Sequence, residues 1–210
     1  MMTIFDIYES IMDRKNRQTV GSNVMDTIKG DVDEFIQKNY ITNHCTYDVI
    51  IKDGKVLVDV YGDISTRANL DYLTNGKFKF NHIQGSFFIR YCDELKSLEG
   101  GPDIVDENYS YAYGRVIKDL EGAPHTVGRA FICSDCRSLV SLKGSPKKCM
   151  HFNVTYCPNL KSLKYGPKEV TKNYIVYETG NDGKETVFTD EDVRKYTKVG
   201  GKIIKFCGEI

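Results

Sequence analysis

A repeat of 21 or 22 residues runs through the middle of the chain and limits its fold more than any other feature. Four prolines recur at intervals of 22, 22 and 21 residues, and two sets of aliphatic residues recur at the same intervals. We call each set of equivalent residues a column. These columns are Pro102, Pro124, Pro146 and Pro167; Leu98, Leu120, Leu142 and Leu163; and Leu95, Ile117, Leu139 and Leu160. Three columns in one register predict tandem units that stack to bury a shared core.

Each unit reads as one short strand followed by a turn. Phe87 and Ile89 alternate with more polar neighbours, a period typical of a strand with one buried face. A Leu-x-Ser-Leu segment and a Gly-x-Pro turn follow, and one apolar residue such as Val105 packs the returning chain. A degraded unit around Leu70, Leu73 and Ile83 precedes the clear ones, and a last strand begins near Tyr174. The sequence therefore predicts an α+β repeat solenoid with parallel strands, at the spacing of leucine-rich repeats.

The repeat also carries a family resemblance. The stretch FKFNHIQGSFFIRYCDELKSLEGGP and the three units after it resemble leucine-rich-repeat proteins encoded by large tailed bacteriophages. The resemblance covers roughly residues 48 to 178 and implies a leucine-rich-repeat fold and a viral origin. It implies no shared catalytic residues. The second unit departs from the pattern because Gly114 stands in the column of Cys92, Cys136 and Cys157.

The ends of the chain predict different structures. Residues 1–46 are expected to be a helical region, with a short helix from Thr3 and a second one capped by Ser22. Residues 47–178 form the solenoid and open with a hairpin that turns at Asp53-Gly54. Residues 179–210 are expected to form a helix with Thr189 as N-cap, followed by a strand. We expect both end regions to cap the open solenoid. The alternative is that the N-terminal helices bind a partner.

Charge and apolar content predict a cytoplasmic protein. The 29 basic residues balance the 29 acidic ones, so the totals do not indicate a strongly basic nucleic-acid binder. The first residues are acidic and lack a secretory leader, and the sequence has no long apolar stretch to cross a membrane. If the chain lies in the cytosol of a host cell, its seven cysteines stay reduced.

The cysteines suggest a zinc site at first sight. Cys133 and Cys136 form a C-x-x-C pair, and Cys149, His151 and Cys157 follow closely. The repeat gives a simpler explanation, because Cys133 and Cys149 stand in apolar columns and Cys136 stands in a column shared with Cys92 and Cys157. We therefore predict no metal and no cofactor, and zinc remains the alternative.

An enzyme is not predicted either. The four histidines fall in unrelated phases of the repeat, and one column is shared by serines and Asp119. A column of that kind indicates turn hydrogen bonds and not an activated hydroxyl. The sequence also lacks a nucleophile elbow, a phosphate loop and a dinucleotide fingerprint.

The outward strand positions are the best candidates for function. Aromatic groups beside arginine are common in protein contact hot spots, and a solenoid would present them on one surface. We expect a host or viral protein to be bound there, for example a bacterial defence or metabolic protein. The alternatives are a sponge for a signalling nucleotide or other small ligand, and a structural virion component. The candidate partner-binding residues are Phe88, Arg90, Tyr91, Tyr113, Ile132, Asp135 and Tyr156.

Overall fold

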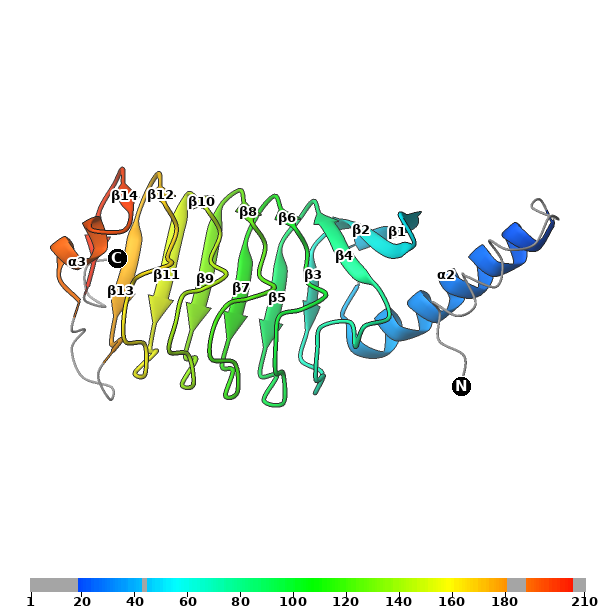
Figure 1. Ribbon diagram of the computed structural model, residues 1–210, viewed down its shortest axis with the longest axis horizontal. Coiled ribbons are helices and arrows are strands. Elements are labelled where there is room, and N and C mark those ends of the chain that lie inside the picture. The colour runs from blue at the N-terminus through cyan, green and yellow to red at the C-terminus, as the bar shows by residue number, and fades with distance from the viewer. Residues whose placement is uncertain (1–18, 43–44, 181–187, 206–210) are drawn as a thin grey trace.

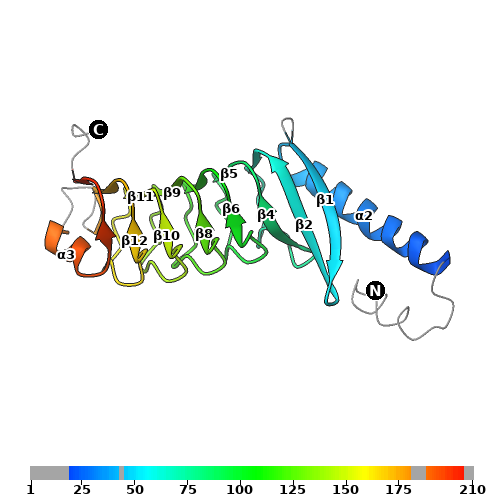
Figure 2. The same cartoon turned by 90° about the horizontal axis from the view of Figure 1, so that it is seen from above.

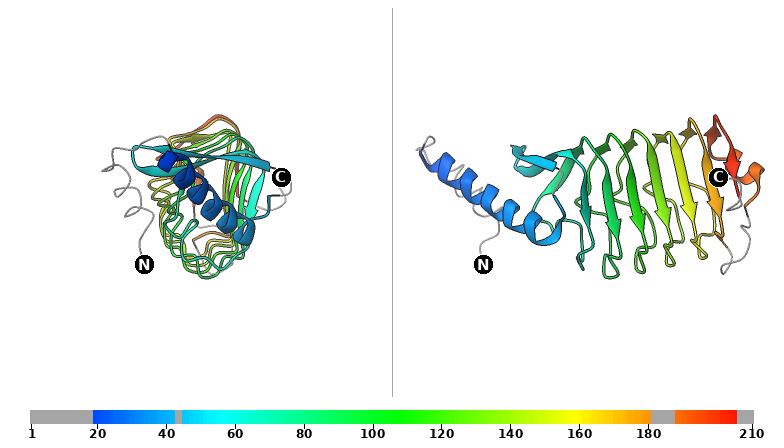
Figure 3. Two further views of the ribbon diagram at one scale, coloured as in Figure 1. Left: turned by 90° about the vertical axis from the view of Figure 1, so that its right-hand side faces the viewer. Right: turned by 180° about the vertical axis from the view of Figure 1, so that it is seen from behind.

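The chain folds into a β-solenoid built from two facing sheets (Figure 1; Figure 3, left). The computed structural model describes residues 19–42, 45–180 and 188–205. One sheet consists of β3 (Ile64–Thr66), β5 (Phe87–Arg90), β7 (Tyr109–Ala112), β9 (Ala130–Ser134), β11 (His151–Thr155), β13 (Tyr174–Tyr177) and β15 (Ile203–Ile204). The other consists of β1 (Cys45–Lys52), β2 (Lys55–Gly62), β4 (Lys79–Ile83), β6 (Ile104–Val105), β8 (Thr126–Val127), β10 (Lys148–Cys149), β12 (Glu169–Val170) and β14 (Lys198–Val199).

Neighbouring coils stack in parallel with the register that the repeat predicts. Phe87 pairs with Tyr109, Tyr109 with Phe131, Phe131 with Phe152, and Phe152 with Tyr174. These five side chains are fully buried, and their ring centroids follow one another at 5.8, 5.3, 5.4 and 5.2 Å. The distance between neighbouring rings is set by the spacing of hydrogen-bonded strands, so equivalent side chains of neighbouring coils stack in contact. The predicted repeat solenoid is confirmed.

The number of strands per coil differs from the prediction. Each clear unit contributes two strands, because the chain after the Gly-x-Pro turn hydrogen-bonds to its neighbours in a second parallel sheet. Val105, expected only to pack the returning chain, lies in β6 of that sheet and is fully buried. A two-residue strand is too short to show an alternation in the sequence, which is why the second sheet was not predicted.

The end elements pack against the same core as the coils. The helix α2 (Thr19–Asn39) buries Ile28, Val32 and Ile36 in the core cluster, and it extends away from the coils at its N-terminal end (Figure 2). Because α2 begins at Thr19, Ser22 lies within the helix and is not its N-cap. The short helix predicted from Thr3 lies outside the described residues.

Two local predictions at the ends are confirmed. The hairpin of β1 and β2 turns at Asp53-Gly54, the pair that the sequence indicated, and both residues have a positive φ. The short helix α3 (Asp190–Arg194) has Thr189 as its N-cap, with a capping box to Asp192.

No helix among the described residues is long and apolar enough to cross a membrane.

Candidate functional site

A row of corner residues runs along one edge of the seven-stranded sheet, at the point where successive strands end. Each is the first residue after its strand, and each has a positive φ between 48° and 61°. They are Tyr91, Tyr113, Asp135, Tyr156 and Glu178, and we call this row the corner ridge. In a strand, successive side chains point to opposite faces of the sheet, and a residue with a left-handed backbone conformation interrupts this alternation. Arg90 and Tyr91 therefore both face outward, and Cys92 is buried in the core.

The tyrosines of the corner ridge are exposed but held in place. Tyr91 is 52% exposed and Tyr113 is 42% exposed, yet their rings stack with centroids 4.5 Å apart and planes 6° from parallel. The guanidinium of Arg67 lies 5.9 Å from the Tyr91 ring, and Tyr156 packs edge-on against Tyr177. The surface therefore presents rigid aromatic groups, which lose little side-chain entropy on contact with a partner.

Ion pairs between and within coils flank the ridge. Arg115 contacts Asp93 of the preceding coil at 3.3 Å, and Arg137 contacts Asp135 at the same distance. Together with Tyr91 and Tyr113 these four residues line a hollow of about 100 Å³. Because the positive and negative charges are paired, the hollow has no excess of either sign.

The other predicted residues lie beside the ridge on the outer face of the same sheet. Phe88 and Ile132 are half-buried members of one row across the strands, in which Ser110 lies between them. Arg90 places its guanidinium 4.9 Å from the ring centre of Phe88. The structure thus puts the seven predicted residues on the corner ridge and the adjacent sheet face.

Sequence reasoning missed two contributors to this surface. Glu178 stands 22 residues after Tyr156, so the repeat register itself would have found it. Arg67 lies just after β3, where the repeat is degraded, and no column indicated its contact with Tyr91.

Inside the corner, the cysteine column forms a ladder of hydrogen bonds between coils. Each thiol donates toward two carbonyl oxygens. The nearer one belongs to the residue two positions earlier, at 3.5, 3.4 and 3.3 Å for Cys92, Cys136 and Cys157. The other belongs to the preceding coil, to Thr66, Tyr111 and Cys133, at 4.0, 3.6 and 3.9 Å. Thr179 continues the ladder by donating from its hydroxyl to the Val154 carbonyl at 3.1 Å. The column therefore satisfies backbone groups at the strand ends, as the sequence indicated.

Gly114 interrupts this ladder for a steric reason. A β-carbon at Gly114 would lie 1.7 Å from the hydroxyl oxygen of Tyr111. Tyr111 is a large residue in the column where other coils have Ile89, Cys133 and Val154. Its hydroxyl fills the place of the missing ladder side chain and is buried without a hydrogen-bond partner.

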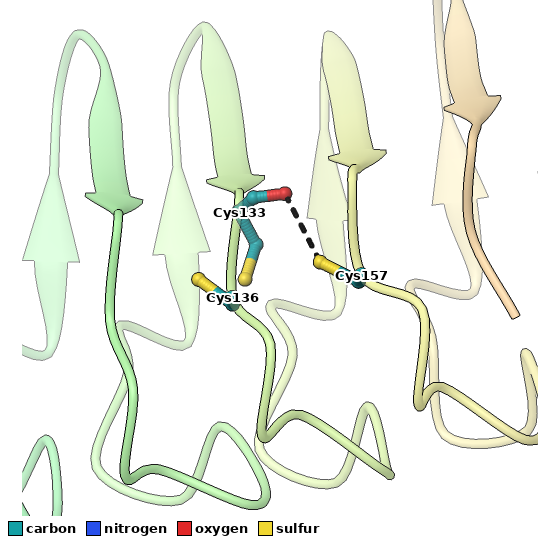
Figure 4. A group of neighbouring side chains, drawn as sticks. All are labelled: Cys133, Cys136 and Cys157. Carbon is teal, nitrogen blue, oxygen red and sulfur yellow. Dashed lines mark hydrogen bonds between the residues drawn. The ribbon is translucent and has the colours of Figure 1, made fainter. Parts of the chain in front are cut away.

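Three thiols of two adjacent coils meet in the core. The sulfurs of Cys133, Cys136 and Cys157 all lie within 4.8 Å of one another, and the three residues are fully buried (Figure 4). Burial raises the pKa of Cys136, and hydrogen bonds with the two neighbouring thiols raise the pKa of Cys133. Hydrogen bonds with Cys133 and Cys136 lower the pKa of Cys157.

The structure separates this cluster from Cys149 and His151, the other two residues of the alternative zinc set. Cys149 lies in β10 of the opposite sheet, where burial raises its pKa to about 12, and His151 is the first residue of β11. No other group of three potential metal ligands occurs in the part of the chain that the structure describes.

The histidines of the described coils are spread over both sheets. His82 in β4 lies 2.9 Å from a carboxylate oxygen of Asp106, on the eight-stranded sheet, whereas His151 begins β11 in the other sheet. The absence of an enzymatic activity stays a prediction.

Comparison with known proteins adds no assignment. No family model matches the chain, and neither a curated protein nor a solved structure does.

Proposed function

We propose that the chain is a non-enzymatic binding protein that holds another protein against the corner ridge and the adjacent face of the seven-stranded sheet. The observation that carries this proposal is the stacked pair of exposed tyrosines, Tyr91 and Tyr113. Exposed rings that are already fixed in place, beside arginine, are typical of residues that dominate protein interfaces.

The geometry of the ridge favours a protein over a nucleic acid. Adjacent rings at 4.5 Å are in contact, so a base cannot enter between Tyr91 and Tyr113 without separating them. Single-stranded nucleic acid also requires a positive groove along its backbone, whereas Arg115 and Arg137 each face a carboxylate. A partner that offers apolar groups and hydrogen bonds fits both observations.

The hollow on this surface is too small to support the alternative of a protein that sequesters a nucleotide. The hollow between the tyrosines and the ion pairs measures about 100 Å³, whereas small-molecule sites in proteins measure about 300 to 1,000 Å³. Contact with a broad protein surface makes use of the ridge without requiring a deep pocket.

The biological setting belongs to the same proposal. The units resemble leucine-rich repeats of large tailed bacteriophages, and the stacked coils with one register support a repeat protein of this kind. We infer that the partner is a bacterial defence or metabolic protein, blocked by steric occlusion in the host cytosol. In this proposal α2 and α3 close the two ends of the solenoid, because both bury side chains in its core cluster.

The test compares two variants in affinity capture from host lysate, followed by identification of the bound protein. We expect the double substitution Tyr91→Ala and Tyr113→Ala to lose the partner while the melting temperature stays nearly unchanged. Tyr61→Ala is the matched control, because Tyr61 is 38% exposed but lies on β2 in the other sheet. A partner retained by the double variant, or lost equally by the control, would show that the ridge is not the binding surface.

A further inference from the structure

The three buried thiols have an arrangement that the hydrogen-bond ladder does not require. Cys136 and Cys157 belong to the ladder, but Cys133 stands in the apolar column of Ile89 and Val154. Its sulfur lies within 4.8 Å of the sulfurs of Cys136 and Cys157. Cys133 therefore adds a third sulfur to the point where two ladder cysteines of adjacent coils already meet (Figure 4).

Buried hydroxyls without partners lie next to this cluster. The hydroxyls of Tyr109 and Tyr111 are buried and form no hydrogen bond. Tyr111 places its hydroxyl at the ladder position of its own coil, one coil before Cys136. In the pairing of β7 with β9, Tyr111 lies opposite Cys133, and Tyr109 lies opposite Phe131, two residues before Cys133. A buried donor without an acceptor is destabilising, so these hydroxyls would gain from an anionic sulfur nearby.

We infer that Cys133, Cys136 and Cys157 form a binding site for a soft monovalent metal ion, copper(I), in the core of the solenoid. Thiolate ligands select copper(I), zinc and iron–sulfur clusters over hard ions. Structural zinc sites are almost always four-coordinate, and the described residues offer three ligands here. Copper(I) has a filled d shell and accepts three sulfurs in a plane.

The distances suit this coordination after a small movement. Three sulfurs around one ion at about 2.3 Å, the metal–sulfur length for zinc, lie about 4 Å apart in a plane. The sulfurs in the structure lie within 4.8 Å of one another, so side-chain rotations bring them to that separation. Each thiol that binds as a thiolate releases its proton to the solvent, and the oxidation state of copper does not change.

The cluster adjoins the corner ridge along the chain. Asp135 and Tyr156 directly precede Cys136 and Cys157, and both have a positive φ. Opening of these two corners would expose the sulfurs while the strands stay paired. Uptake should therefore be slow compared with diffusion, but it should not require global unfolding.

The experiment is an anaerobic titration of the full chain with copper(I) in the presence of a competing copper(I) chelator. The readouts are the ultraviolet sulfur-to-copper charge-transfer band and X-ray absorption at the copper edge. We expect one copper per chain with three sulfur neighbours. In the starting protein, Cys45→Ser removes a half-buried thiol outside the cluster, and Cys207→Ser removes the cysteine that lies outside the described residues.

The ladder supplies a matched pair of variants. Cys136→Ser and Cys92→Ser make the same chemical change in the same buried column, but only Cys136 belongs to the cluster. A hydroxyl maintains the ladder, as Thr179 shows, so both variants should fold. We expect Cys136→Ser to weaken copper binding at least 100-fold and Cys92→Ser to change it less than threefold. Even the loss of a hydrogen-bond partner behind a ligand costs about 10- to 100-fold in other metal sites, and the loss of a ligand should cost more.

Three results would overturn the proposal. The first is that the starting protein takes up no copper in competition with the chelator. The second is equal loss of binding in Cys136→Ser and Cys92→Ser. The third is tighter binding of zinc than of copper(I), which would refute the choice of ion. Partner capture is tested at Tyr91 and Tyr113 and copper ligation at the cysteines, so either proposal can fail while the other holds.

Discussion

The pairing of Tyr111 with Gly114 gives the sharpest test of how the coils are packed. The perturbation is Gly114→Cys, which restores the residue type found in the same column of the neighbouring coils. In the native chain the new β-carbon would meet the Tyr111 hydroxyl oxygen at 1.7 Å and the adjacent ring carbon at 2.1 Å. Tyr111 is fully buried, so its ring cannot move aside.

The magnitude follows from the usual cost of overpacking. Extra groups in a packed core cost about 1 to 3 kcal/mol, and a contact this short on a buried ring belongs at the upper end. We therefore expect Gly114→Cys to lower the free energy of unfolding by about 3 kcal/mol. In a Tyr111→Val background the obstacle is gone, and the new thiol can join the ladder between Cys92 and Cys136. There the same change should cost close to nothing.

The assay is a double-mutant cycle by urea denaturation under reducing conditions, followed by circular dichroism. The expected coupling energy between positions 111 and 114 is about 3 kcal/mol, the upper end of values for residues in contact. The slope of the unfolding free energy with urea should be the same in the four proteins. A coupling energy below about 0.5 kcal/mol would refute the argument, because it would mean that the two positions act independently.

Two further predictions concern the turn after the strands and the last helix. Tyr165 has a φ of 71° where other coils have glycine, so Tyr165→Gly should raise the free energy of unfolding by up to about 1 kcal/mol in the same urea assay. Gly122→Ala should lower the free energy of unfolding, because its β-carbon would lie 2.4 Å from a backbone carbon. A change of the same sign in both variants would contradict this explanation. Hydrogen bonds from Thr189 lower the pKa of Asp192 in the folded chain. The Asp192 carboxylate therefore stabilises the fold at pH values above its unfolded pKa, and this stability is lost as the pH falls through the lower folded pKa. Asp192→Asn should make stability depend less on pH below pH 4, as monitored by circular dichroism, and an unchanged pH dependence would contradict this link.

The repeat made the stacked coils predictable, because column positions report directly on which residues lie on one another. The columns of Leu95 and Leu98 and the aromatic column of Phe87 are buried as expected. The hairpin turn at Asp53-Gly54 and the Thr189 cap were predictable for a different reason, since each depends on local backbone chemistry within four residues.

The remaining features depend on contacts that a single column does not show. Each cysteine of the buried cluster has a satisfactory explanation in its own column, yet Cys133 and Cys157 meet diagonally across two coils. The interruption at Gly114 is visible in the sequence, but its cause lies in a side chain three residues earlier. The positive φ of the three corner tyrosines has no sequence signal either, because tyrosine is not a typical residue of the left-handed region.

The backbone of the corner ridge sets which surfaces this scaffold can evolve. A β-branched side chain at a positive φ is a genuine outlier, so valine, isoleucine and threonine are costly at each corner. The ridge can vary among aromatic, acidic and amide residues without disturbing the coils, and this chain uses tyrosine, aspartate and glutamate there. Diversification of the ridge would thus change ring edges and charges, while aliphatic contacts must come from the neighbouring sheet face, where Phe88 and Ile132 lie.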